Sequence, residues 1–456
     1  MDRSVLETLL ERSEENRVRL HMPGHKGREL LGDFWRDVFK IDVTELFDTD
    51  DLYRPSGMIK ESQTIAAGLW GAGSSFYLPG SSTAGILAGV FSATQQKKTV
   101  VMARNCHKSV YAACDLAGAD KVFVLPRRDP ESGAFTVVDP EDLDAALRDN
   151  PDAALAVVTS PGYEGAVCDV AALKRVCAAH KVPLMTDEAH GAHLGISGVF
   201  GGSAVRAGSD VTVQSLHKTL PCLTQVGIAH LCADYPYKEE FIRYLSMLQS
   251  SSPSYLFIAC ADACVRLMRD RGKELLERWK RMTEDFEKRL DGLKKVRLFR
   301  PGCLTDPTKI TLITPDGTKY LSRLADMKID CEMALGKRLV LYTGLGTEPE
   351  DLDRAFQALK TLETEDIPDV GTFDATDSLP PRGVIRGKTV SVPAKDAAGM
   401  TSAEYIWAYP PGIPLVCPGE ILEEKTLATL ERLCASGARV DHSAAEDGIA
   451  VFDERA

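Results

Sequence analysis

The stretch Val211-Thr212-Val213-Gln214-Ser215-Leu216-His217-Lys218-Thr219 joins a short apolar run to a polar segment that carries a lysine. A second apolar run, residues 182–185, leads in the same way into Asp187-Glu188-Ala189-His190. Both patterns predict a buried strand that ends in polar residues, one βα unit apart. Because α/β sheets bind their ligands at the carboxyl ends of strands, we expect an amine and a carboxylate at one sheet edge.

Apolar strands and amphipathic helices alternate from about residue 59 onward. Fully apolar strands separated by helices predict an α/β fold with a mostly parallel sheet that is covered on both faces. The expected strands are residues 99–102, 122–125, 155–159, 182–185, 211–213 and 226–230. The expected helices of this region are residues 61–70, 84–94, 236–248, 254–271 and 272–293.

Three domains are expected along the chain. Residues 1–58 form a helix at about 2–16 and a polar, irregular arm, residues 59–300 form the large domain, and residues 301–456 form a smaller α+β domain. In this last domain the expected elements are strands at 309–313 and 338–342 and helices at 320–326 and 348–361.

Composition excludes several classes of protein. The chain has 456 residues and a net charge of −12, whereas a nucleic-acid binder needs clustered Lys and Arg. Its twelve cysteines form no CxxC pair, which is typical of small buried side chains in a reducing compartment. No apolar run reaches the roughly 18 residues of a membrane span. We therefore expect a cytoplasmic protein that does not bind nucleic acid or enter a membrane.

A lysine and an aspartate at neighbouring strand ends are the pair that a pyridoxal 5'-phosphate (PLP) site requires. Lys218 would form a Schiff base with the aldehyde, and Asp187 would keep the pyridine nitrogen protonated. The small side chain of Ala189 would let the ring lie flat on the backbone. The segment 80–85, Gly-Ser-Ser-Thr-Ala-Gly, opens a helix whose N–H groups and hydroxyls suit a phosphate. Alone, such a segment is more often a simple helix cap, but beside Lys218 and Asp187 the phosphate interpretation is favoured.

Two further patterns admit alternatives. His107 follows the strand at 99–102, where an imidazole can stack on a flat cofactor or simply cap a helix. Asp187, His190 and His193 lie in one short loop and would serve a metal-dependent hydrolase, with His21 and His25 as further ligands. The metal interpretation leaves Lys218 without a role.

Seven motifs then occur in an order that resembles the Orn/Lys/Arg decarboxylase family, in its short bacterial form. They are HMPGHKG at 21–27, GSSTAG at 80–85, RNCHKS at 104–109, DEAHGAH at 187–193, SLHKT at 215–219, SSPSY at 251–255 and YPPGIPLVCPGE at 409–420. The resemblance covers nearly the whole chain. It implies a fold type I, aspartate aminotransferase-like large domain with PLP as the cofactor, and α-decarboxylation of arginine, lysine or ornithine.

The resemblance also implies roles for individual residues. Lys218 matches the Schiff-base lysine, Asp187 the partner of the pyridine nitrogen, and His107 the stacked imidazole. The expected phosphate ligands are Ser81, Ser82, Ser215 and His217, with Thr83 less certain. Ser251 matches a residue that reaches the neighbouring subunit's cofactor, which implies a homodimer. His190 stands where long forms carry Trp, and Glu420 lies where the family has an acid near the substrate's distal cation.

Several points stay open from the sequence. The proton donor to Cα is His217, Lys218 or a tyrosine. A buried cation requires an acidic partner, so an acid must contact the distal cation of the substrate. The candidates are Glu420, Glu164, Asp42 and Glu45. The alternatives to a decarboxylase are an aminotransferase or aldolase-like lyase, and a catalytically silent binding protein. An aminotransferase would use an arginine for the α-carboxylate, with Arg338, Arg382 and Arg386 as candidates.

Overall fold

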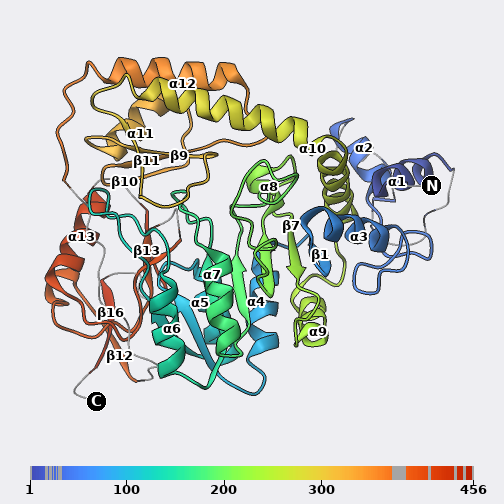
Figure 1. The fold of residues 1–456 in the computed structure, drawn as a ribbon, viewed down its shortest axis with the longest axis horizontal. Coiled ribbons are helices and arrows are strands. Elements are labelled where there is room, and N and C mark those ends of the chain that lie inside the picture. Colours follow the sequence, from blue (N-terminus) through green and yellow to red (C-terminus); the bar gives the residue numbers. More distant parts are fainter. Residues whose placement is uncertain are drawn as a thin grey trace. The chain divides into compact units, whose positions relative to one another are not determined.

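The computed structural model describes residues 3–15, 19, 23, 25, 26, 28, 33–371, 387–408, 412–435, 439–444 and 448–453. The chain forms two compact units whose elements are labelled in Figure 1. The first unit comprises Met1–Ala93, Pro183–Arg278 and Gly344–Gly346. The second comprises Thr94–Val182, Trp279–Thr343 and Thr347–Ala456. The three domain ranges expected from the sequence stay predictions.

The first unit contains four sheet strands, which lie side by side in the order β1 (Ser74–Leu78), β7 (Gly227–Leu231), β6 (Val211–Gln214) and β5 (Leu184–Asp187). Strand β5 runs parallel to β6, whereas β7 is antiparallel to both of its neighbours. The predicted strands at 182–185, 211–213 and 226–230 are confirmed within two residues. Strand β1 was not predicted, because its two serines interrupt the apolar pattern.

The helices of the first unit cover this sheet and extend from it. They are α1 (Val5–Glu14), α2 (Asp33–Ile41), α3 (Met58–Trp70), α4 (Ser82–Ala93), α8 (Leu216–Thr219), α9 (Lys238–Leu248) and the part of α10 (Tyr255–Leu290) up to Arg278, the rest of which belongs to the second unit. The prediction of an irregular arm is wrong at α2, where Asp33 in the first turn and Lys40 in the last suit the helix dipole. The prediction of two helices at 254–271 and 272–293 is also wrong. The chain continues helically through Gly272, because an interior glycine costs a helix only about 1 kcal/mol.

One buried carboxylate fastens the N-terminal helix to the rest of the first unit. Asp262 on α10 is fully buried and accepts hydrogen bonds from the backbone N–H of Val5, at 2.8 Å, and from the hydroxyl of Ser62 on α3. Its charge is balanced by Arg266, whose Nε lies 2.8 Å from Oδ1. Each contact satisfies a group that would be costly to bury alone.

Glycines let α4 approach the sheet closely. A Cβ on Gly85 would lie 2.9 Å from Leu78 Cδ1, and one on Gly89 would overlap Met185. A Cβ on Gly227 of β7 would lie 2.8 Å from the carbonyl oxygen of Gln214 and 3.2 Å from the N atom of Ser82. The start of α4 therefore lies directly against strands β6 and β7, with no room for a side chain between them.

The second unit begins with the parallel strands β2 (Thr99–Ala103), β3 (Asp120–Val124) and β4 (Ala153–Thr159), in the order β4-β2-β3. Its helices here are α5 (Lys108–Ala117), α6 (Pro140–Asp149) and α7 (Val170–Ala179). The chain thus has the α/β fold that the sequence predicts, with a mostly parallel sheet of seven strands, β1 to β7.

A four-stranded antiparallel sheet follows, in the order β10 (Met333–Leu335), β11 (Arg338–Tyr342), β9 (Lys309–Ile313) and β8 (Arg297–Leu298). Helices α11 (Gly317–Asp326) and α12 (Pro349–Leu362) bury their apolar faces against it. The predicted bounds of β9 and β11 are confirmed to the residue. The remaining elements are β12 (Thr389–Val392), β13 (Ile406–Ala408), β14 (Pro414–Val416), α13 (Glu424–Ala435), β15 (Val440–His442) and β16 (Ile449–Phe452).

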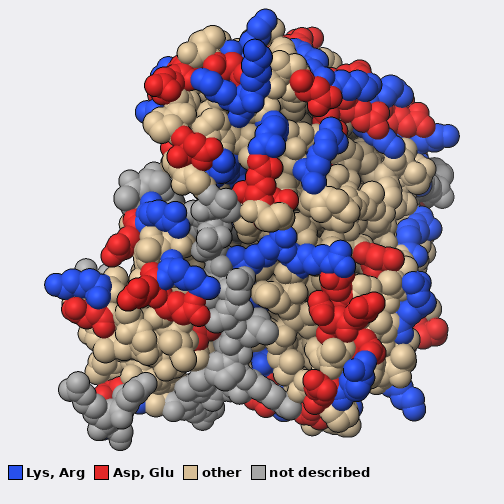
Figure 2. Space-filling view, turned by 60° about the vertical axis from the view of Figure 1, so that its left-hand side comes forward, with Lys and Arg blue, Asp and Glu red and all other residues tan. Residues whose placement is uncertain are grey.

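Surface charge is mixed on the face that Figure 2 shows, where basic and acidic side chains alternate over short distances. Among the described residues, no helix combines the length and the apolar character that crossing a membrane requires.

The close packing around Gly227 gives a first prediction. We expect Gly227→Ala to lower the free energy of unfolding by about 1–3 kcal/mol, because the clashing atoms belong to backbone that cannot rotate away. It should also weaken the binding of anions at the start of α4. Gly68→Ala on α3 is the control: no atom lies within 4 Å of its Cβ position, so the unfolding midpoint in urea should stay or rise slightly. Equal midpoints for both variants would contradict the close approach.

Candidate active site

Strand pairing brings the carboxylate and the amine together. Asp187 is the last residue of β5 and pairs with Val213 of β6, from which the chain passes through Ser215 into α8 and Lys218. Asp187 is 4% exposed, and this burial raises its pKa. The positive charge of Lys218 and the backbone N–H of Ala189, 3.1 Å from Oδ1, act in the opposite direction. Lys218 is thus near enough to influence Asp187, as the sequence predicts.

The Lys218 amine also contacts a histidine. Its Nζ lies 2.9 Å from Nε2 of His190, whose side chain is 8% exposed. The short helix α8 that carries Lys218 is held at its end, because the N–H of Leu345 donates to the carbonyl oxygen of Thr219 at 3.0 Å. Sequence reasoning placed His190 and Lys218 in one site but did not predict this contact.

A chain of buried polar side chains supports the strand ends. Glu188 Oε1 accepts from the N–H of Ala204 at 2.6 Å, and its Oε2 accepts from Gln214 Nε2 at 2.7 Å. Gln214 Oε1 lies 3.2 Å from Nε2 of His230, and Nδ1 of that ring lies 2.7 Å from the Ser75 hydroxyl. Burial lowers the pKa of His230 to about 3, so the ring is neutral.

The order of protons in this chain follows from the donors and acceptors. Glu188 can only accept, so Gln214 presents its amide nitrogen to Glu188 and its oxygen to His230. His230 therefore carries its proton on Nε2, and Nδ1 accepts from Ser75. Four neighbouring strands, β5, β6, β7 and β1, are linked in this way. No pattern in the sequence indicates this network.

The predicted anion site opens helix α4. Ser81 has a φ of 124°, a strained conformation that is common at ligand clamps, and its Oγ accepts from the N–H of Thr83 at 3.0 Å. Ser215 Oγ donates to Ser82 Oγ at 2.9 Å, which joins the helix start to the segment before Lys218. His217 turns toward the backbone instead: its Nδ1 lies 2.8 Å from the carbonyl oxygen of Val226. Burial lowers the pKa of His217, so this ring is neutral.

These residues fit PLP. Oδ1 of Asp187 accepts from Ala189, and within the described chain Oδ2 accepts no hydrogen bond, so a protonated ring nitrogen would satisfy it. The anion site at Ser81 and Ser82 belongs to the same unit as Lys218 and Asp187. Ser251, also in this unit, is exposed in the loop that follows α9.

His107 and Glu420 lie in the second unit. His107 caps α5, because its Nδ1 accepts from the N–H of Ser109 at 3.2 Å. This is the helix-capping role that the sequence offered as an alternative. Its predicted stacking on the cofactor stays a prediction. Glu420 Oε1 lies 3.0 Å from Arg104 Nη2, and both side chains are only 2% exposed. Its Oε2 accepts from the N–H of Cys417 at 2.9 Å.

Two of the four acids expected near the substrate's distal cation, Glu420 and Glu164, are already engaged. Glu164 pairs with Arg338 in a buried ion pair. This pairing also removes Arg338 as a holder of the substrate's α-carboxylate, and Arg382 and Arg386 lie outside the described residues. Both oxygens of Glu420 thus serve the second unit's own packing.

The metal alternative gains no support from the geometry. Within the described part of the chain, no three His, Cys, Asp or Glu side chains converge as a metal site would require. His190 contacts Lys218, and His193 packs edge-on against Phe200 at 5.0 Å between ring centroids. His25 lies 3.2 Å from Asp42, and His21 lies outside the described residues.

Comparison with known families agrees with this geometry. The model of the Orn/Lys/Arg decarboxylase major domain matches residues 4–322, and that of the C-terminal domain of the same family matches residues 375–440. The chain belongs to the Orn/Lys/Arg decarboxylase family. Members of this family are PLP-dependent decarboxylases of basic amino acids, so the chain is such an enzyme and the aminotransferase, hydrolase and silent-protein alternatives fall away.

Similar proteins cover the family's short and long forms. The uncharacterized protein YaaO of Bacillus subtilis is 33% identical over 96% of both chains. The arginine decarboxylase of Bacillus subtilis is 28% identical, with 93% of this chain and 92% of that protein covered. The inducible lysine decarboxylase of Escherichia coli is 22% identical over 93% of this chain and 76% of its own length.

A solved structure shows the same fold. The lysine decarboxylase LdcF of Francisella novicida superposes with a TM-score of 0.81 at 20% identity, covering 99% of this chain and 81% of that one.

The buried ion pair gives a second prediction. Burial raises the pKa of Glu420, and Arg104 and the Cys417 N–H counteract this. Glu420→Gln removes the negative charge and leaves Arg104 buried without it, which should cost about 3–5 kcal/mol of unfolding free energy. Glu431→Gln, on the exposed face of α13, should leave the urea midpoint unchanged. A variant of normal stability with a raised KM would instead return Glu420 to the substrate site.

Proposed function

We propose that this family member acts on arginine, removing its α-carboxylate as CO2 and releasing the corresponding amine. The observation that carries the proposal is the pairing of Asp187 and Lys218 at neighbouring strand ends of one unit. The choice of arginine is supported by the relatives. Four arginine decarboxylases are 28–29% identical over at least 90% of both chains, whereas the lysine decarboxylases are 22% identical and longer.

Each residue of the site has a proposed task. PLP, when bound, supplies a sink for the electrons that leave the bond between Cα and the carboxylate. Asp187 holds a proton on the pyridine nitrogen, and Lys218 provides the amine that binds the aldehyde carbon. Ser81, Ser82, Thr83, Ser215 and His217 are the proposed phosphate contacts, and Ala189 underlies the ring.

Lys218 and His190 are proposed to share the work of proton transfer. With 2.9 Å between Nζ and Nε2, a proton on the amine has an acceptor within hydrogen-bonding distance. Protonated Lys218 would deliver a proton to Cα, His190 would then pass its Nε2 proton to the Lys218 amine, and His190 would regain from solvent the one proton that each turnover consumes. The neutral His217 is a weaker candidate, because its Nδ1 is engaged by Val226.

We also propose that the enzyme is a cytoplasmic homodimer. The exposed Ser251 loop is free to reach a neighbouring subunit, as the family resemblance implies. A measured solution mass of one chain would contradict the dimer.

An assay of purified protein tests the function. With PLP present, we expect CO2 and an amine from arginine, and a kcat/KM at least tenfold lower for lysine and ornithine. Lys218→Ala should lose turnover and the visible absorbance of the bound cofactor, and Asp187→Asn should keep the cofactor but lose most of kcat. Lys273→Ala, an exposed lysine on α10, is the matched control. Normal turnover by Lys218→Ala, or a keto acid as the product, would refute the proposal.

Replacement of His190 tests the proton route. His190→Ala should lower kcat roughly 10- to 100-fold, near the lower end of what general acid-base groups contribute, with little change in cofactor absorbance. The control is His180→Ala, because His180 lies at the end of α7 and pairs with Asp144. A change in KM alone would assign His190 to substrate binding instead.

A further inference from the structure

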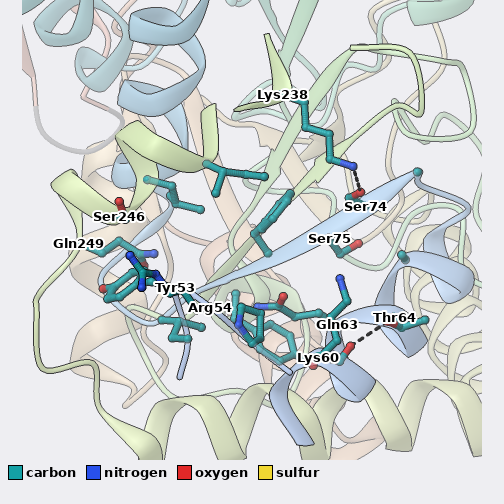
Figure 3. A pocket seen from close by; sticks show the side chains of 18 residues that line it. Tyr53, Arg54, Lys60, Gln63, Thr64, Ser74, Ser75, Lys238, Ser246 and Gln249 are labelled. Atoms are coloured by element: carbon teal, nitrogen blue, oxygen red, sulfur yellow. Dashed lines mark hydrogen bonds between the residues drawn. The ribbon is translucent and has the colours of Figure 1, made fainter. Parts of the chain in front are cut away.

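The first unit contains a cavity of about 480 Å³ that the decarboxylase chemistry does not use. Figure 3 shows it between strand β1, helix α3, helix α9 and the segment that precedes α3. None of the proposed PLP contacts lines it. Its size falls in the range of small-molecule sites.

The charge of the lining is one-sided. Arg54, Lys60 and Lys238 line the cavity, and none of its eighteen lining residues is Asp or Glu. Among the described residues, none of these three side chains forms an ion pair with a carboxylate. In a chain with a net charge of −12, three cations around one acid-free cavity favour an anionic occupant.

Two polar side chains are prepared for a ligand. Gln249 is 8% exposed, and its Oε1 is buried with no hydrogen-bond partner among the described residues, a state that costs about 1–3 kcal/mol. A ligand hydroxyl would satisfy it. Lys238 Nζ donates to Ser74 Oγ at 3.0 Å, as the dashed line in Figure 3 shows, which leaves the Ser74 proton to donate to an anion.

The remaining wall suits a carbon skeleton. Leu52, Phe76, Ile242 and Leu245 contribute apolar surface. Strand β1 is the first strand in the order of its sheet and pairs only with β7, so its outer edge is open toward further polar contacts. A charged group, a hydroxyl and an apolar body are thus each matched by a different part of the lining.

We propose that this cavity binds a small organic phosphate that carries hydroxyl groups. The phosphate meets Arg54, Lys60 and the Lys238–Ser74 pair, and a hydroxyl donates to Gln249. Arginine and lysine are the side chains that most often bind phosphate, the former through a planar fork of N–H groups. This site is independent of the proposed arginine specificity.

Calorimetric titration of the PLP-loaded enzyme tests the site, because the cofactor then fills its own phosphate site. The probes are AMP, glucose 6-phosphate and inorganic pyrophosphate at low salt. We expect saturable binding of at least one organic phosphate with a Kd below about 1 mM. The nucleotide and sugar arms distinguish which skeleton the apolar wall prefers.

Variants locate the binding. Lys60→Ala combined with Lys238→Ala should weaken binding at least tenfold, whereas Lys273→Ala combined with Lys360→Ala, two exposed lysines elsewhere, should not. Gln249→Leu should weaken the hydroxyl-bearing probes and spare pyrophosphate. kcat for decarboxylation without probe should be unchanged in all variants. Absence of saturable binding, or equal binding by the Lys60/Lys238 variant, would overturn the proposal.

Discussion

The parallel pairing of β5 with β6 is the constraint on which the active site depends. It places Asp187 opposite Val213, so that β5 and β6 end at the same sheet edge. Lys218 follows β6 within the single turn of α8. Burial alone would disfavour the charged form of Asp187. The lysine and the Ala189 N–H reduce that cost without cancelling it, and the same arrangement suits a protonated ring between amine and carboxylate.

Asp187 and Glu188 are adjacent carboxyl groups with different surroundings. Glu188 is fully buried and accepts from Ala204 and Gln214, so it serves as the acceptor end of a satisfied network. Among the described residues, Asp187 accepts one backbone hydrogen bond, and its second oxygen is left for a ligand. Two acids in sequence therefore divide into a structural and a chemical role through their hydrogen bonds, as in other sites where environment separates paired carboxyl groups.

The local pattern of apolar and polar residues predicted the features that depend on one short segment of sequence. The apolar runs located β9 and β11 to the residue, and the polar segments after β5 and β6 located Asp187 and Lys218. Contacts between distant segments were not predictable in the same way. Arg104 contacts Glu420, which lies 316 positions away in the sequence, and Ser75 contacts His230, 155 positions away. Such contacts depend on the topology of the fold, which the periodicity of the sequence does not indicate. Helix α2 was missed although five of its nine residues are apolar and recur at helical spacing, because the polar residues that flank it dominate the segment.

The two buried arginine–carboxylate pairs bear on how the distal cation of a basic amino acid is held. Arg104 neutralises Glu420 and Arg338 neutralises Glu164, so neither acid can bind a second cation without leaving an arginine buried alone. Of the acids named from the sequence, Asp42 and Glu45 remain, both in the first unit with Lys218. Asp42 contacts Nε2 of His25 at 3.2 Å and, among the described residues, forms no ion pair with an arginine. The arm between α1 and α3 is thus where a carboxylate is still available at low cost to the fold.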